Sequence, residues 1–352
     1  MRRFLLALIA AALVLVRAPL HADDLVLRLF GDYLDSLRIQ AAIPGLSAAI
    51  VGDDEIVWER TFGQQDVERS FSARSDTPFH LDGLTQVFTA AMVLRCVEDG
   101  RLSLDDRVSQ FKPDSPDANA TLRQLLTHTS GPADGLSFAY RPERLDPLTA
   151  AVRRCTDDSF RETLANLLER LAMSDSVPGP DVIRIAPPAE GIPSPAAVER
   201  YTRVLGRLAI PYTTDRQGRP SPSQYPATTL TPSSGLISTT RDFAKFDIAL
   251  RRGVLLRADT LAAAWQRPVG RNGQTLPHGI GWFVQTYNGE TVAWQFGIGD
   301  NASSSLVVKV PARGITLILL ANGDGLVKSL GLASGDLTTS PVGRLFLGLF
   351  VR

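Results

Sequence analysis

The spacing of apolar residues at the beginning of the chain predicts one helix followed by a β-hairpin. Apolar side chains recur every four residues over 24–40, the repeat of one helix face, at Leu25, Leu29, Tyr33 and Leu37. The apolar segments 46–51 and 56–62 are separated by the turn sequence 52–55, Gly-Asp-Asp-Glu. Two strands this close together predict an antiparallel hairpin.

The remaining pattern predicts helices in the middle of the chain and strands near its end. Helices are expected over 83–98, which Gly100 ends, and over 159–173 and 241–251. Thr121 and Gln124 form a capping box, which predicts another short helix. Prolines and glycines punctuate 178–232, which indicates ordered loop with short helices. Before a last helix, the four strands expected are 281–287, 291–296, 304–310 and 315–321.

This order of elements predicts an α+β fold in a single domain, 23–352. We expect one antiparallel sheet that takes strands from both ends of the chain, about 23–80 and 270–352. A mostly helical insertion, about 81–269, separates the two sheet parts along the chain.

The first residues have the composition of a cleavable secretory signal. Arg2 and Arg3 precede an apolar run over 4–16, and Ala22 is the expected cleavage residue. A transmembrane anchor is the alternative, but the run is short for a bilayer core of about 30 Å. We therefore expect a signal peptide over 1–22, a periplasmic or secreted mature protein, and no membrane span after the signal is removed.

Composition narrows the classes of partner and cofactor. Lysine plus arginine equals aspartate plus glutamate, at 37 each, so no basic surface for nucleic acid is expected. The four histidines show no spaced cluster with cysteine or aspartate, so no metal and no cofactor are predicted. Cys96 and Cys155 are the only cysteines; export would permit a disulfide, which stays open, but the interpretation we favour is two buried or half-buried free thiols.

Six motifs occur in a characteristic order along the chain: 43–47 (IPGLS), 76–79 (DTPF), 88–106 (beginning FTAAMVL and ending EDGRLSLDD), 121–131 (TLRQLLTHTSG), 234–242 (SGLISTTRD) and 319–322 (LLAN). Together they resemble the serine β-lactamase and penicillin-binding-protein family, which includes class C β-lactamases, D-alanyl-D-alanine peptidases and related esterases. The resemblance runs from about 25 to 322. It implies the β-lactamase/transpeptidase-like fold, in which helices flank an antiparallel sheet.

The chemistry that the resemblance implies needs a serine that attacks a carbonyl and a lysine three residues later that removes its proton. Residues i and i+3 share a helix face, which explains the spacing. Counting from the aromatic Phe79 places Gly83 at the serine and Gln86 at the lysine. The first has no side chain and the second does not titrate, so both the nucleophile and the base are missing.

Two further motifs of the family are altered as well. In the Y-x-N motif, Tyr140 keeps the tyrosine but Pro142 stands in place of the asparagine. In the K/H-T/S-G motif, Gln295 replaces the cation and Gly297 keeps the glycine. These six positions, Gly83, Gln86, Tyr140, Pro142, Gln295 and Gly297, form the degenerate pocket that the resemblance predicts.

Other residues offer little replacement chemistry. Ser109 and Lys112 form a literal S-x-x-K, but they lie outside the expected pocket. Thr85 is rotated about 200° around the helix from Gly83 and has a structural role. Asp82 is expected to cap that helix. His128 belongs to a structural motif of the family, and His80 and His278 are isolated in sequence.

Two functions compete on this basis. The first is an exported pseudoenzyme that keeps the fold and binds a ligand or partner. The alternative is a serine-type hydrolase, of the esterase, β-lactamase or D-Ala-D-Ala peptidase class, with a relocated or altered active site, or an acid-base catalyst that uses Tyr140. The resemblance points to peptidoglycan-type peptides, β-lactams or small esters as ligands, and the oligomeric state is open.

Overall fold

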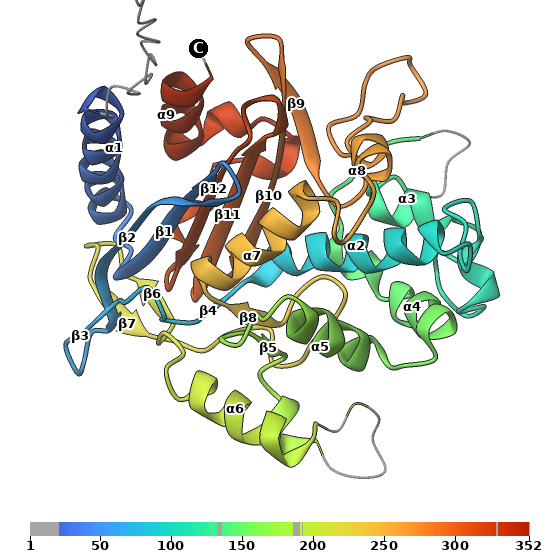
Figure 1. The fold of residues 1–352 in the computed structure, drawn as a ribbon, viewed down its shortest axis with the longest axis horizontal. Helices are drawn as coiled ribbons and strands as arrows, with labels where there is room; N and C mark the ends of the chain where they lie inside the picture. Colours follow the sequence, from blue (N-terminus) through green and yellow to red (C-terminus); the bar gives the residue numbers. More distant parts are fainter. Residues whose placement is uncertain (1–20, 132–135, 186–190, 192, 329, 352) are drawn as a thin grey trace, which may run out of the picture.

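A seven-stranded antiparallel sheet forms the centre of the protein, as the computed structural model shows (Figure 1). The structure describes residues 21–131, 136–185, 191, 193–328 and 330–351. The strand order is β3-β2-β1-β12-β11-β10-β9, so strands from the two ends of the chain meet where β1 pairs with β12. The expected α+β class and the sheet built from both chain ends are confirmed.

The predicted N-terminal elements are present. Helix α1 (His21–Gln40) precedes β1 (Gly45–Gly52) and β2 (Glu55–Asp66), which form an antiparallel hairpin, and β3 (Phe71–Ser72) adds an edge. The signal peptide expected over 1–22 lies almost wholly outside the described residues.

The C-terminal strands also follow the predicted pattern, with bounds shifted by a few residues. They are β9 (Phe283–Tyr287), β10 (Glu290–Gly299), β11 (Ser303–Val310) and β12 (Ile315–Ala321), and the last helix is α9 (Pro341–Phe350). The four strands pair in sequence, β9 with β10, β10 with β11 and β11 with β12, and all three pairs are antiparallel.

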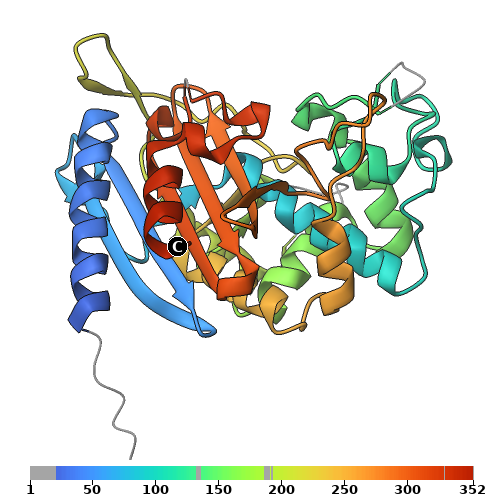
Figure 2. The ribbon, with the colours of Figure 1, turned by 90° about the horizontal axis from the view of Figure 1, so that it is seen from above.

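Each face of the sheet is covered by helices from a different part of the chain. One face packs against α1 and α9, where Phe30 lies 6.4 Å from Phe346 between ring centroids (Figure 2). The other face packs against α2 (Thr85–Glu98) and α7 (Thr240–Arg251). Successive side chains of a strand point to opposite faces of the sheet. The neighbours Leu319 and Leu320 therefore lie in the hydrophobic cores on the two different faces.

The middle of the chain forms the helical part on one side of the sheet (Figure 1). Its further helices are α3 (Leu122–Leu126), α4 (Leu148–Thr156), α5 (Phe160–Arg170), α6 (Pro195–Leu205) and α8 (Ala258–Ala264). Its short strands are β4 (Phe79–His80), β5 (Val177–Pro178) and β8 (Leu236–Ser238), which form one small sheet, and the pair β6 (Tyr212–Thr214) and β7 (Pro220–Pro222). The capping box at Thr121 and Gln124 is present as predicted.

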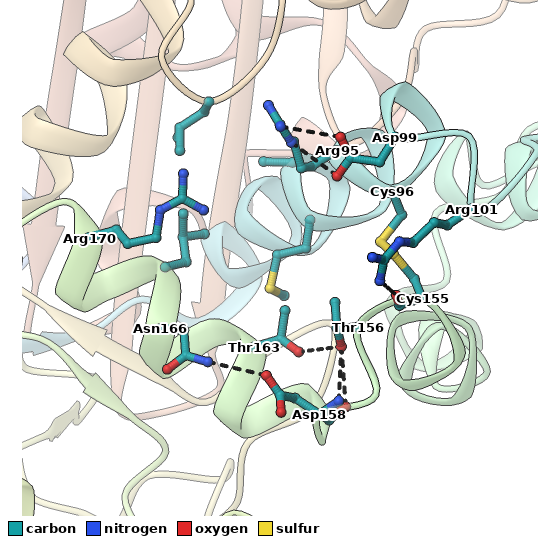
Figure 3. A pocket seen from close by; sticks show the side chains of 14 residues that line it. Arg95, Cys96, Asp99, Arg101, Cys155, Thr156, Asp158, Thr163, Asn166 and Arg170 are labelled. Carbon is teal, nitrogen blue, oxygen red and sulfur yellow. Dashed lines mark hydrogen bonds and ion pairs between the residues drawn. A yellow bond between two sulfur atoms is a disulfide. The ribbon is translucent and has the colours of Figure 1, made fainter.

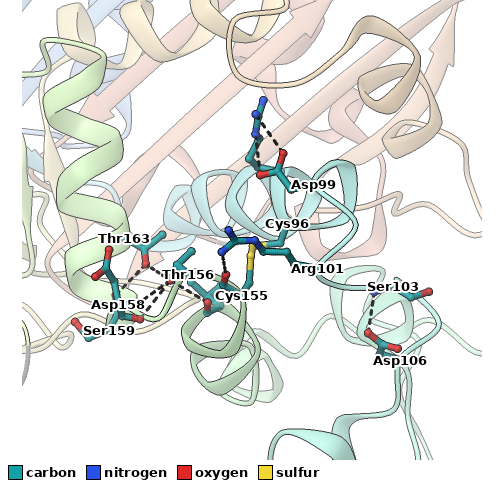
Figure 4. Close-up of a disulfide and its surroundings, with 12 residues drawn as sticks. Cys96, Asp99, Arg101, Ser103, Asp106, Cys155, Thr156, Asp158, Ser159 and Thr163 are labelled. Carbon is teal, nitrogen blue, oxygen red and sulfur yellow. Dashed lines mark hydrogen bonds and ion pairs between the residues drawn. A yellow bond between two sulfur atoms is a disulfide. The ribbon is translucent and has the colours of Figure 1, made fainter.

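The two cysteines form a disulfide, so the expectation of free thiols is wrong. Cys96 lies near the end of α2 and Cys155 near the end of α4, and their sulfurs are bonded at 2.03 Å (Figure 4). The residues are 59 positions apart in sequence, and only the packing of α4 on α2 brings them together. No helix in the described ranges is long and apolar enough to cross a membrane.

Candidate functional site

The position predicted for the nucleophile lies just before α2. Gly83 is the middle residue of a short 3-10 helix, Asp82–Leu84, that leads directly into α2. Asp82 does not cap the helix, because its carboxylate accepts a hydrogen bond from the Ser303 hydroxyl at 2.6 Å instead. The expected cap is therefore wrong, and Asp82 ties this turn to the first residue of β11.

The backbone of β10 closes the space in which a side chain at position 83 would lie. A Cβ atom on Gly83 would fall closer than 3.0 Å to the Phe296 carbonyl oxygen, an approach that real Cβ atoms essentially never show. The other side of the contact is equally close, since a Cβ on Gly297 would lie 2.7 Å from the Gly83 nitrogen. Glycine at both positions permits this approach of two backbones.

Gln86 is held by two partners one helical turn after Gly83. His128 accepts the Arg141 backbone N–H at Nδ1 (3.3 Å), so its proton is on Nε2. That Nε2–H donates to Gln86 Oε1 at 3.0 Å. Gln86 Nε2 in turn donates to the Tyr140 hydroxyl at 2.7 Å. Both ends of the Gln86 amide are thus occupied.

The same chain of hydrogen bonds continues through Gln295. The Tyr140 hydroxyl is 3.5 Å from Gln295 Oε1, which also accepts the Phe296 N–H at 2.9 Å. Gln295 Nε2 donates to His278 Nε2 at 3.3 Å. His278 carries its proton on Nδ1, because Nδ1 lies 2.6 Å from the Gly279 carbonyl oxygen, which only accepts.

We call these five side chains, Gln86, His128, Tyr140, His278 and Gln295, the amide–imidazole chain. Every donor in it points in one direction, from the Arg141 amide to the Gly279 carbonyl. Gln86 and Gln295 are only 1% and 0% exposed. Buried polar groups are stable only when their hydrogen bonds are made, and here neutral groups make them all.

Burial keeps the titratable members of the chain neutral. Burial lowers the pKa of His128 to about 3. Burial, and then the nearby His128, lowers the pKa of His278 well below its usual value. Burial also raises the pKa of the Tyr140 hydroxyl, against the opposite effect of its hydrogen bond from Gln86. At neutral pH the chain therefore holds two neutral imidazoles and a protonated phenol, with no lysine among its members.

The family model described as Beta-lactamase matches residues 27–334, most of the chain. The chain belongs to the beta-lactamase family.

Solved structures share the beta-lactamase-family fold at low identity. The octameric penicillin-binding protein homologue from Pyrococcus abyssi has a TM-score of 0.72 at 19% identity, covering 91% of this chain and 77% of that one. The penicillin binding protein from Bacillus halodurans has a TM-score of 0.66 at 18% identity, covering 82% and 94%. At these identities the likeness concerns the fold.

Curated relatives match over part of their length. Protein flp of Staphylococcus aureus (strain COL) is 32% identical over 120 residues, 31% of this chain and 24% of that protein. Esterase EstB of Burkholderia gladioli is 34% identical over 129 residues, 35% of this chain and 33% of that protein. Each match spans a third or less of the relative's own length.

The structure brings together five of the six positions that the sequence assigned to the beta-lactamase-family pocket. Gly83, Gln86, Tyr140, Gln295 and Gly297 meet at the start of α2 and along β10. Pro142 begins a separate 3-10 helix, Pro142–Leu145, and is not part of the amide–imidazole chain.

Two members of the amide–imidazole chain, His128 and His278, were not predicted from the sequence. His128 and His278 lie 4.7 Å apart between ring centroids, so the description of His278 as isolated holds only along the sequence. They are 150 positions apart, and no local pattern pairs them. Thr85 has the expected structural role, since its hydroxyl accepts the Leu236 N–H at 3.3 Å.

The literal S-x-x-K does not form a nucleophile–base pair. Ser109 lies in a three-residue 3-10 helix, and the Lys112 ammonium bonds to the Asp146 carboxylate at 2.6 Å. That hydrogen bond raises the pKa of Lys112, so its amine stays protonated and cannot accept the serine proton. Within the described ranges, no group of three or more His, Cys, Asp or Glu side chains could hold a metal ion.

Proposed function

We propose that this member of the beta-lactamase family is an exported, non-catalytic pseudoenzyme that binds a ligand or partner. The observation that carries the proposal is the contact between Gly83 and the backbone of β10. It leaves no room for a side chain at the position that the resemblance assigns to the nucleophile. Covalent acyl transfer needs an attacking atom and a base, and this position provides neither.

The amide–imidazole chain supports the same conclusion. Catalytic lysines and histidines work through the charge they gain or lose, whereas Gln86 and Gln295 never titrate. Tyr140 is a poor substitute base, because burial raises its pKa further above neutrality. The relatives include an esterase and penicillin-binding proteins, which favours an ester, a β-lactam or a peptidoglycan-type peptide as the ancestral ligand class.

The decisive test is covalent labelling. The purified protein is incubated with a fluorescent penicillin and, separately, with a fluorophosphonate, and its intact mass is measured, with a catalytically competent family member as the positive control. We expect no adduct on this chain. A stoichiometric adduct mapped to Ser109 would establish the relocated-nucleophile alternative instead, and an adduct on any other serine would show that the reactive pocket lies elsewhere.

Export is part of the proposal and has its own test. The arginine and apolar pattern of 1–22 supports a cleaved signal, and the disulfide is of the kind that forms in oxidising compartments. Intact mass of the protein recovered from the exported fraction should show the loss of about the first 22 residues. A full-length mass in that fraction would contradict cleavage.

A further inference from the structure

A concave site lies at the far end of α2, away from Gly83. Its cavity has a volume of about 340 Å³, within the range of small-ligand sites (Figure 3). It is bounded by the second half of α2, the end of α4 with the disulfide, and α5. We call it the disulfide pocket.

The inner wall of the disulfide pocket is apolar. Met92 and Leu167 contribute buried side chains from α2 and α5, and the Cys96–Cys155 disulfide adds its two sulfurs. A methionine thioether is flexible and polarisable and is common at hydrophobic binding surfaces. The wall therefore suits the hydrocarbon part of a ligand.

Most charged groups at the rim already have partners. Arg95 pairs with Asp99 at 3.2 Å. Arg101 donates to the Cys155 carbonyl oxygen at 2.5 Å. The Asp158 carboxylate accepts from the Asn166 amide at 3.3 Å. These contacts are drawn in Figure 3 and, around the disulfide, in Figure 4.

Arg170 differs from these groups. Its guanidinium forms no hydrogen bond or ion pair with any described part of the chain. Figure 3 shows it directed towards the pocket from the side opposite Arg101. The pocket thus combines an apolar wall with one guanidinium at its rim that has no partner in the described part of the protein.

We propose that the disulfide pocket binds a small monocarboxylate with an aliphatic body. The carboxylate would pair with Arg170, whose planar guanidinium matches carboxylate geometry with two parallel hydrogen bonds. The aliphatic part would lie against Met92, Leu167 and the disulfide. This site does not depend on the proposal that the Gly83 position is non-catalytic, and its test does not depend on hydrolysis.

The methionines provide a direct readout of occupancy. The chain has three, Met1, Met92 and Met173, and only Met92 lines the pocket. Methionine-methyl ¹³C NMR of the purified chain is recorded during titration with octanoate, with neutral 1-octanol as the matched uncharged probe. We expect saturable movement of the Met92 signal, no movement of the buried Met173 signal, and weaker binding of octanol by about threefold, the size of one exposed ion pair.

Two variants separate the site from general binding. Arg170→Gln should weaken octanoate about threefold and leave octanol unchanged. Arg216→Gln removes another exposed charge, in the β6–β7 turn outside the pocket, and should change neither. No saturable shift of Met92, equal affinity for octanoate and octanol, or equal loss in both variants would each overturn the proposal.

Discussion

At the scale of single residues, the glycine at position 83 and the glutamines at positions 86 and 295 contribute to the structure in different ways. Gly83 is required by a close backbone approach, so its lack of a side chain has become part of the packing. Gln86 and Gln295 each supply one donor group and one acceptor, which a lysine could not, since an ammonium only donates. Glycine at position 83 and glutamine at positions 86 and 295 are therefore each required by contacts within the folded protein.

Serine at position 83 and lysine at position 86, the residues that the family resemblance expects there, should destabilise the protein. Gly83→Ser would place a Cβ against the Phe296 carbonyl, which should destabilise the fold by about 1–3 kcal/mol, typical of overpacking. Gln86→Lys would leave the His128 Nε2–H facing a donor. We expect the double variant to be less stable in urea and still unlabelled by fluorescent penicillin.

The control for that variant is Gly348→Ser on α9, where a Cβ would meet nothing within 4 Å. It should change the free energy of unfolding by about 0.5 kcal/mol or less. Covalent labelling at position 83 in the double variant would show that β10 yields and that the family cleft can reopen.

At the scale of elements, local sequence patterns predicted individual helices and strands, but they did not predict contacts between residues that are far apart in sequence. The helix 24–40, the hairpin after it and the capping box at Thr121 were readable because each depends on neighbours a few positions apart. The pairing of Cys96 with Cys155 depends on α4 packing against α2, which no periodicity encodes. Asp82 was misassigned for the same reason, since its partner Ser303 lies on a distant strand.

Removing the disulfide should measure what that long-range link contributes. It closes a loop between residues 59 positions apart, for which the chain-entropy relation gives about 4 kcal/mol. We expect the double variant Cys96→Ala, Cys155→Ala to lose about this much free energy of unfolding in urea. Reductant should lower the wild type towards the variant and leave the variant unchanged, whereas equal stability of the two proteins would contradict a stabilising role.

At the scale of the whole molecule, the amide–imidazole chain joins segments that are far apart in sequence. Gln86, His128 and Tyr140 come from the helical part, whereas His278 and Gln295 come from the C-terminal segment and β10. The amide–imidazole chain thus links the packing of the helical part to the packing of the sheet. Below about pH 6.5 its neutrality is a property of the folded state alone, because both imidazoles are exposed to water, and bind protons, once the protein unfolds.

That difference predicts how global stability depends on pH. In the unfolded chain both histidines have a pKa near 6.5, whereas in the folded protein burial lowers the pKa of His128 to about 3 and that of His278 well below its usual value. Below about pH 6.5 the unfolded state therefore binds protons that the folded state excludes. The free energy of unfolding should fall as the pH is lowered from 6.5 towards 3, by up to about 1.4 kcal/mol per pH unit for each histidine, and this contribution should vanish above pH 7.

Urea unfolding between pH 7.5 and 4.5 measures this slope against two variants. His128→Asn removes one titrating group, and asparagine suits the positive φ of 52° at that position. His278→Asn removes the other titrating group. Each variant should be less stable than the wild type at pH 7.5, because a buried hydrogen bond is lost, yet each should show a shallower slope by about one proton. Carboxylates contribute equally to all three proteins, so the comparison isolates the imidazoles, and parallel profiles would show that the two histidines do not remain neutral in the folded state.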